Sequence, residues 1–232
     1  RATVERLLGR SEVEQAITLL LEKIEVVATS EKDDWITSSV QEEQEPRQVT
    51  GEELRRSLKP NWDLDNPFQL WVTGDSMVRF FGDTLVSLAE TSTMVQATSE
   101  PVLSSGLSRP DFFDWPARLA EIMTKHDPDA VVISLGGNDA QNIRAGDGQW
   151  LERFNEAWLA EYRRRIGTVM DLVTSDADRV LLWVGQPPMR EEGFDQRMQL
   201  LNNLYQVEAA ERDRVQYVDL RGLFTDNSEN YS

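Results

Sequence analysis

Residues 69–76 read Gln-Leu-Trp-Val-Thr-Gly-Asp-Ser, and this stretch decides the fold. The run Gln69–Thr73 has the length and composition of a short buried strand. The apolar residues that follow, from Met77 to Leu85, have helical spacing and predict a helix. Ser76 therefore lies where the chain turns sharply from strand to helix, with its hydroxyl facing solvent and its amide at the positive end of a helix. Such a position suits a nucleophile, although Asp or Ser after a strand is also typical of a simple helix cap.

The change from strand to helix repeats along the chain. Apolar runs with the length of strands lie at Gln69–Thr73, Met94–Thr98, Ala130–Leu135, Val180–Val184 and Gln216–Leu220. Helical periods between them are marked by Trp115, Leu119, Ile122 and Met123, by Phe154, Trp158, Tyr162, Ile166 and Val169, and by Phe194, Met198, Leu201 and Tyr205. This alternation predicts an α/β protein: a three-layer α/β/α sandwich around a five-stranded parallel sheet of flavodoxin-like type. Ligands of such sheets bind outside the carboxyl ends of the strands.

The first 66 residues have a different pattern. Residues 11–28 have the spacing of an amphipathic helix, with Ser11 and Glu14 in the positions of a capping box. The charged and polar stretch from Thr29 to Asn66 indicates a solvated linker. We therefore expect a helical appendage and acidic linker over residues 1–66 and the main domain over residues 67–232.

Composition limits the classes of partner. The 232 residues carry a formal net charge of −17, with a sequence pI near 4.5, which argues against nucleic acid or anionic lipid as a ligand. The absence of cysteine excludes disulfides, thiol nucleophiles and cysteine-ligated metals, and leaves the compartment open. No apolar run reaches the eighteen residues of a membrane span. Because the sequence begins at Arg1, we expect residues upstream of it in the native protein.

A second motif follows the predicted strand Ala130–Leu135. It reads Gly136-Gly137-Asn138-Asp139, in which the glycines allow a close backbone approach and the Asn138 side-chain amide can donate to an oxyanion. A plain tight turn is the alternative reading. The two motifs strengthen each other because both follow strands at the edge where ligands bind.

Together the two motifs resemble blocks I and III of the SGNH (GDSL-like) hydrolase superfamily. Three further segments are similar to one branch, a domain of unknown function related to cell-envelope O-acyl esterases and acyltransferases. They are Ser105-Gly106-Leu107, Arg109-Pro110-Asp111-Phe112-Phe113-Asp114-Trp115 and Trp183-Val184-Gly185-Gln186-Pro187-Pro188-Met189-Arg190. The similarity runs from Leu70 to Tyr231, and it implies the SGNH hydrolase fold.

The resemblance implies a role for each matching residue. Ser76 would attack an ester carbonyl and form an acyl-serine, with the oxyanion held by the amides of Ser76, Gly106 and Asn138. Asp75 and Asp139 would brace this site through hydrogen bonds. Residues expected at the mouth of the site, where they could contact substrate, are Arg109, Gln141 and Arg190.

The resemblance also bears on partners. It implies no metal and no organic cofactor, and a small-molecule or polysaccharide ester as substrate, with O-acetyl groups of envelope polysaccharides as the leading candidate. An extracytoplasmic or cell-envelope location is the favoured one. Hydrolysis and acyl transfer both stay open.

One expected block is missing. The superfamily takes the serine proton with a histidine in an Asp-x-x-His block near the carboxyl terminus, and no such block occurs here. The only histidine, His126, precedes the strand Ala130–Leu135, and a strand of six residues spans about 20 Å, which puts His126 at the wrong edge of the sheet. We expect the native chain to continue past Ser232 into Asp-x-x-His. Without that block the chain should be almost inactive.

Other classes fit the sequence less well. One histidine and no cysteine do not make a usual zinc site, no Gly-x-Gly-x-x-Gly or P-loop follows the first strand, and no acidic pair stands out as that of a glycosidase. The serious rival is a catalytically inactive carbohydrate-binding or scaffold protein with the same fold. Five aromatic residues suit either a sugar platform or the core: Phe112, Phe113, Trp115, Trp150 and Trp158.

Overall fold

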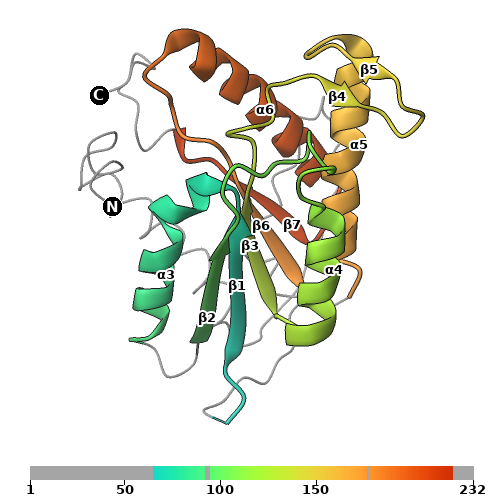
Figure 1. Cartoon of the computed structure of the whole chain (residues 1–232). Coiled ribbons are helices and arrows are strands. Elements are labelled where there is room, and N and C mark those ends of the chain that lie inside the picture. The colour runs from blue at the N-terminus through green and yellow to red at the C-terminus, as the bar shows by residue number, and fades with distance from the viewer. Residues whose placement is uncertain (1–64, 92–94, 177, 222–232) are drawn as a thin grey trace, which may run out of the picture.

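The computed structural model describes residues 65–91, 95–176 and 178–221, which form a five-stranded parallel sheet covered by helices (Figure 1). The strand order is β2-β1-β3-β6-β7, and every neighbouring pair is parallel. The strands are β1 (Phe68–Gly74), β2 (Val95–Pro101), β3 (Ala130–Ser134), β6 (Val180–Val184) and β7 (Val215–Val218). The predicted three-layer α/β/α fold is confirmed.

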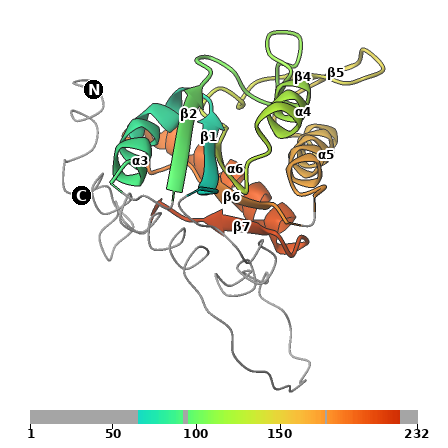
Figure 2. The same ribbon diagram turned by 90° about the horizontal axis from the view of Figure 1, so that it is seen from below.

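The helices lie on both faces of the sheet (Figure 2). Helix α3 (Gly82–Ala89) covers one face, where it packs on residues of β1 and β2. The other face packs against α4 (Trp115–His126), α5 (Glu156–Val173) and α6 (Glu192–Ala210).

The central strand β3 shows why the predicted runs are continuously apolar. Val131 and Ile133 belong to the cluster beneath α4, α5 and α6, whereas Ala130 and Val132 belong to the cluster beneath α3. Side chains of a strand point alternately to the two faces, and both faces are buried here. A strand in this position cannot alternate with polar residues.

Two features differ from the prediction. The helix expected directly after Ser76 is divided into a 3₁₀ helix, η1 (Ser76–Phe80), and α3. Gly82, at the start of α3, lies so close to β2 that a Cβ atom there would be 2.6 Å from the Ser99 hydroxyl. A short antiparallel hairpin, β4 (Ile143–Arg144) with β5 (Trp150–Leu151), was not predicted, because two-residue strands carry no periodic signal.

The appendage predicted over residues 11–28 and nearly all of the linker lie outside the described residues. Asp65 and Asn66 are exposed, and β1 begins at Phe68, beside the predicted boundary. The division at residue 67 stays a prediction. In the described ranges no helix combines the length and the apolar character needed to cross a bilayer.

Candidate functional site

The candidate site lies where three loops follow β1, β2 and β3, at the carboxyl edge of the sheet (upper end in Figure 1). Ser76 comes from the loop after β1, Gly106 from the loop after β2 and Asn138 from the loop after β3. Because β1 lies between β2 and β3 in the sheet, the three loops are neighbours. The residues predicted for the nucleophile and the oxyanion donors therefore share one edge of three adjacent strands.

Asp75 joins the first loop to the third. One carboxylate oxygen accepts from the Met77 amide at 2.8 Å, and the other accepts from the amides of Gly136 at 3.0 Å and Gly137 at 2.9 Å. The side chain is fully buried. Burial raises the pKa of Asp75 to about 7, although the three amide donors favour the charged form. Asp75 thus holds the turn that carries Ser76 against the loop of Asn138.

The turn before Ser76 requires glycine. Gly74 has φ of +145°, and a Cβ atom there would collide with the carbonyl oxygen of Ser134 on β3. Asp75 then donates its amide to that same carbonyl at 3.0 Å. This close approach leaves Ser76 exposed at the end of the strand, as a nucleophile requires.

Asn138 joins the third loop to the second. Its side-chain Nδ2 donates to the carbonyl of Ser105 at 2.9 Å, and its carbonyl accepts from Gln141 Nε2 at 2.6 Å. An amide nitrogen carries two hydrogens, so the bond to Ser105 orients the side chain and leaves one N–H for an oxyanion.

Asp139 is the fully buried anchor of the second loop. Its carboxylate accepts from the Ser108 amide at 2.7 Å and from the Tyr162 hydroxyl at 2.8 Å. Gly106 passes so close to this carboxylate that a Cβ atom would collide with it. Burial raises the pKa of Asp139, and it raises the pKa of Tyr162 as well. Asp75 and Asp139 thus each hold separate segments together through hydrogen bonds, and their part in catalysis stays a prediction.

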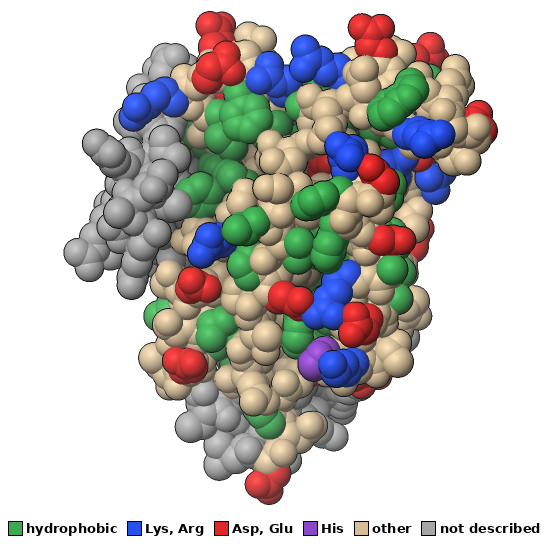
Figure 3. Space-filling view, viewed as in Figure 1, with side chains coloured by type: hydrophobic (Ala, Val, Ile, Leu, Met, Phe, Trp, Pro, Cys, Tyr) green, Lys and Arg blue, Asp and Glu red, His purple; other side chains and the backbone are tan. Residues whose placement is uncertain are grey.

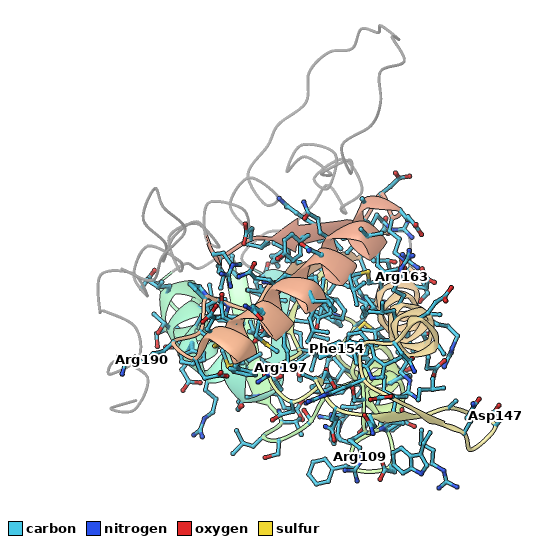
Figure 4. The ribbon with its side chains drawn as sticks, turned by 90° about the horizontal axis from the view of Figure 1, so that it is seen from above. Arg109, Asp147, Phe154, Arg163, Arg190 and Arg197 are labelled. Carbon is cyan, nitrogen blue, oxygen red and sulfur yellow. The ribbon has the colours of Figure 1, made fainter. Side chains whose placement is uncertain are left out.

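The three predicted substrate-contact residues do not gather at one point. Gln141 lies against Asn138, because its side-chain Nε2 donates to the Asn138 carbonyl. Arg109 follows the Gly106 loop and forms an exposed ion pair with Asp111 at 2.8 Å. Arg190 is exposed just before α6, and Figure 4 shows it well apart from Arg109. The roles of all three stay predictions.

His126 lies away from this site. It ends α4, its ring centroid is 4.4 Å from that of Trp71, and it lines a small pocket with Gln69 and Gln96 near the start of β1 and β2. The strand β1 separates this pocket from Ser76. The sequence-based placement of His126 at the opposite edge agrees with this geometry, and Figure 3 shows the histidine in purple.

No candidate metal centre emerges from the described ranges, since no three His, Asp or Glu side chains converge within them. The absence of a cofactor stays a prediction.

Sequence reasoning missed several residues that build the site. Ser108 donates its hydroxyl to the Asp139 carbonyl at 2.8 Å, and Trp158 donates its indole N–H to the Gln141 carbonyl at 2.8 Å. Tyr162 was predicted only as part of a helical period. These contacts join residues 17 to 31 positions apart, and only the fold brings such residues together.

This five-stranded parallel sheet, with the Gly-Asp-Ser turn after β1 and the Gly-Gly-Asn-Asp loop after β3, defines the chain as a three-layer α/β/α protein of flavodoxin-like type. It belongs to the family described as "Protein of unknown function (DUF459)", whose model matches residues 69–232. The resemblance to a branch of unknown function is thereby confirmed.

The solved structures that are similar to the chain include two esterases. A carbohydrate acetylesterase family member from Sinorhizobium meliloti is 16% identical over 66% of this chain and 82% of that chain, with a TM-score of 0.47. The inhibitor-bound aryl esterase of M. smegmatis is 16% identical over 66% and 83% of the two chains, with a TM-score of 0.44. No curated protein matches the sequence.

Proposed function

We propose that this protein is a serine esterase or O-acyltransferase that works through an acyl-serine at Ser76. One observation carries the proposal: Ser76 stands exposed at the end of β1, Asp75 ties its loop to the loop of Asn138, and Asn138 ties that loop in turn to the loop of Gly106. A serine that only packs or caps a helix requires neither this exposure nor these hydrogen bonds between loops.

The chemistry follows from these positions. The Ser76 oxygen attacks the ester carbonyl carbon and loses its proton to a base, and the carbonyl oxygen becomes an oxyanion. That oxyanion accepts from the amides of Ser76 and Gly106 and from Asn138 Nδ2. When it collapses, the alcohol leaves with a proton and the acyl group stays on Ser76. Water or a second hydroxyl then takes the acyl group, which gives hydrolysis or transfer respectively.

The base is the remaining requirement. His126 is at the opposite end of β1, and it is the only histidine of the 232 residues. We propose that a histidine in an Asp-x-x-His block, the arrangement of the superfamily that the sequence resembles, takes the proton. Loss of the histidine of a subtilisin-type triad lowers kcat by about 10⁶, so the 232-residue chain should turn over esters very slowly and still bind them.

The proposed substrate is an ester on a saccharide, with an O-acetyl group of a cell-envelope polysaccharide as the leading case. An extracytoplasmic or cell-envelope location belongs to this proposal. The second candidate is a carbohydrate-binding or scaffold protein that has lost catalysis, and the exposed indole of Trp150, which suits a sugar ring, supports it.

The test is p-nitrophenyl acetate turnover by this chain beside a version extended to the native carboxyl terminus. Each is measured with Ser76→Ala and with a matched control, Ser87→Ala, which removes another exposed serine hydroxyl from α3. Activity in the extended form that Ser76→Ala abolishes and Ser87→Ala leaves intact would establish the serine esterase. Turnover insensitive to Ser76→Ala, or none in any form, would favour the binding protein.

A further inference from the structure

A pocket lies beside the candidate site, and the Gly106 loop forms one of its walls. It has a volume of about 640 Å³, within the range of small-molecule sites. Its walls come from three places: the loop of Gly106 to Pro116, the hairpin with Arg144 and Trp150, and α5 with Glu161 and Arg165. Gly106 lines this pocket and also belongs to the candidate oxyanion site, so the pocket and the site adjoin.

Arg165 holds two walls of the pocket together. Its guanidinium donates to the Leu107 carbonyl at 2.7 Å, in the Gly106 loop, and to the Arg144 carbonyl at 2.8 Å, in the hairpin. Its Nε binds Glu161 at 2.7 Å, and only 11% of the side chain is exposed. The pocket is therefore preformed, because a largely buried arginine that is bonded at all three of its nitrogens already holds these walls in place before a ligand binds.

The hairpin presents a cation beside an aromatic ring. Arg144 and Trp150 are directly opposite each other in the β4–β5 pair, so their side chains are neighbours on one face. Trp150 is 65% exposed, whereas two other tryptophans considered as sugar platforms, Trp115 and Trp158, are 1% and 0% exposed and belong to the core. An indole face left in solvent at a pocket wall is suited to packing against the C–H face of a sugar ring.

Arg144 differs from the other arginines of the pocket. Arg109 is paired with Asp111, and both Arg164 and Arg165 are paired with Glu161. Arg144 Nε reaches only the Gly148 carbonyl, at 3.4 Å, and within the described ranges no carboxylate lies in ion-pair distance of its guanidinium. A planar guanidinium with unused donors is the preferred partner of a carboxylate, which it binds with two parallel hydrogen bonds.

We propose that this pocket binds a uronic acid unit of an acidic oligosaccharide, with its ring on Trp150 and its carboxylate on Arg144. The inference rests on the proposed function, which it deepens: the ester attacked by Ser76 would be carried by a neighbouring sugar of the same chain.

The net charge of −17 repels any polyanion, nucleic acid and uronate chains alike. The attraction for a uronate therefore has to come from the pocket itself, from the guanidinium of Arg144 and the exposed ring of Trp150. On the face of the molecule that Figure 3 shows, the basic side chains lie mostly in the upper half. Figure 4 shows Arg109 and the hairpin residue Asp147 on one side of the molecule.

The test is calorimetric binding of hexagalacturonic acid to the full chain carrying Ser76→Ala, beside the neutral hexasaccharide maltohexaose. We expect hexagalacturonic acid to bind more tightly. Trp150→Ala and Arg144→Gln should each weaken that binding on the order of tenfold. Two matched controls should change it by less than about twofold. Lys125→Gln removes an exposed cation near the end of α4, and Val207→Ala trims an exposed apolar side chain of α6 that does not line the pocket.

Three outcomes would overturn the inference: no binding of hexagalacturonic acid, equal binding of maltohexaose, or binding that Arg144→Gln and Trp150→Ala leave unchanged. Because Ser76→Ala removes the nucleophile, binding here is independent of turnover. Ser76-dependent hydrolysis without binding in this pocket would sink only the present inference, and binding without hydrolysis would sink only the esterase.

Discussion

At Gly106 the second loop of the site passes close to the third. A Cβ atom there would collide with the buried carboxylate of Asp139, which also holds the Ser108 amide and the Tyr162 hydroxyl. The side chain of Asp139 cannot withdraw without losing these bonds. The geometry thus requires glycine at this position for packing alone, whatever its amide does in catalysis.

We therefore expect Gly106→Ala to lower the free energy of unfolding by about 1–3 kcal/mol, the usual cost of overpacking. Gly146→Ala is the matched control, since a Cβ atom at Gly146 would meet nothing within 4 Å. That control should change stability by less than about 0.5 kcal/mol. Urea unfolding followed by circular dichroism measures both, and equal effects of the two substitutions would contradict the proposed packing.

The raised pKa of Asp75 makes the stability of the protein depend on pH. Its pKa in the folded protein is raised to about 7 by burial, above the usual value of 3.8 for an aspartate. A carboxyl group whose pKa is raised by folding contributes stability that is fully present below about pH 4 and is lost as pH rises through about 7. Above that pH the buried carboxyl group of the folded protein is charged, which costs free energy. The shift corresponds to roughly 4 kcal/mol at most. Burial raises the pKa of Asp139 as well, which adds to this trend.

Unfolding of the native protein and of Asp75→Asn at pH 5 and pH 8 tests this linkage. The variant should be less stable at pH 5, because its amide nitrogen cannot accept from Gly136 and Gly137. The difference should narrow at pH 8, where the native protein has lost the stability that the proton provides. A difference that stays constant or widens from pH 5 to pH 8 would show that Asp75 is not the linked group.

At the scale of elements, α5 holds the loop that follows β3. Trp158 of α5 donates its indole N–H to the Gln141 carbonyl, and Gln141 donates to the carbonyl of Asn138. Trp183 of β6 is also fully buried, yet its indole N–H has no partner within the described ranges. The two tryptophans are thus a matched pair that differs in one hydrogen bond.

Trp158→Phe should destabilise the protein by about 1 kcal/mol more than Trp183→Phe, since both leave a similar cavity but only the first leaves a carbonyl unpaired. Denaturant unfolding gives the two values. Amide hydrogen exchange around Gln141 should also quicken in Trp158→Phe alone. Equal destabilisation and unchanged exchange would show that the loop is held by other contacts.

The helices and strands themselves follow from local pattern to different degrees. Val180–Val184 was predicted with the bounds that the structure has, because a strand buried on both faces is apolar throughout. The break between η1 and α3 was not predicted, and neither was the close approach of Gly82, at the start of α3, to Ser99 of β2. Local sequence spacing does not indicate which residue of another strand will lie against a glycine.

At the scale of the whole molecule, the net charge of −17 is a stability term. Like charges repel in the compact state, and the screening length falls from about 30 Å at 0.01 M salt to about 8 Å at 0.15 M. We expect the unfolding temperature at pH 8 to rise over that range of sodium chloride. At pH 5, near the sequence pI of about 4.5, the rise should be much smaller. An unfolding temperature that falls with salt at pH 8 would mean that the surface ion pairs outweigh the repulsion.

The sequence by itself determined the α/β class, the five parallel strands and the position of Ser76 and Asn138 at strand ends. These features depend on short-range periodicity and on the rule that parallel strands expose their carboxyl ends at one edge. The tertiary structure alone decided which aromatic residues face solvent, what Asp139 binds, and that Arg144, Trp150 and Arg165 enclose a pocket beside Gly106. Those features depend on strand order and on contacts between distant residues, which arise only when the sheet assembles and brings its loops together.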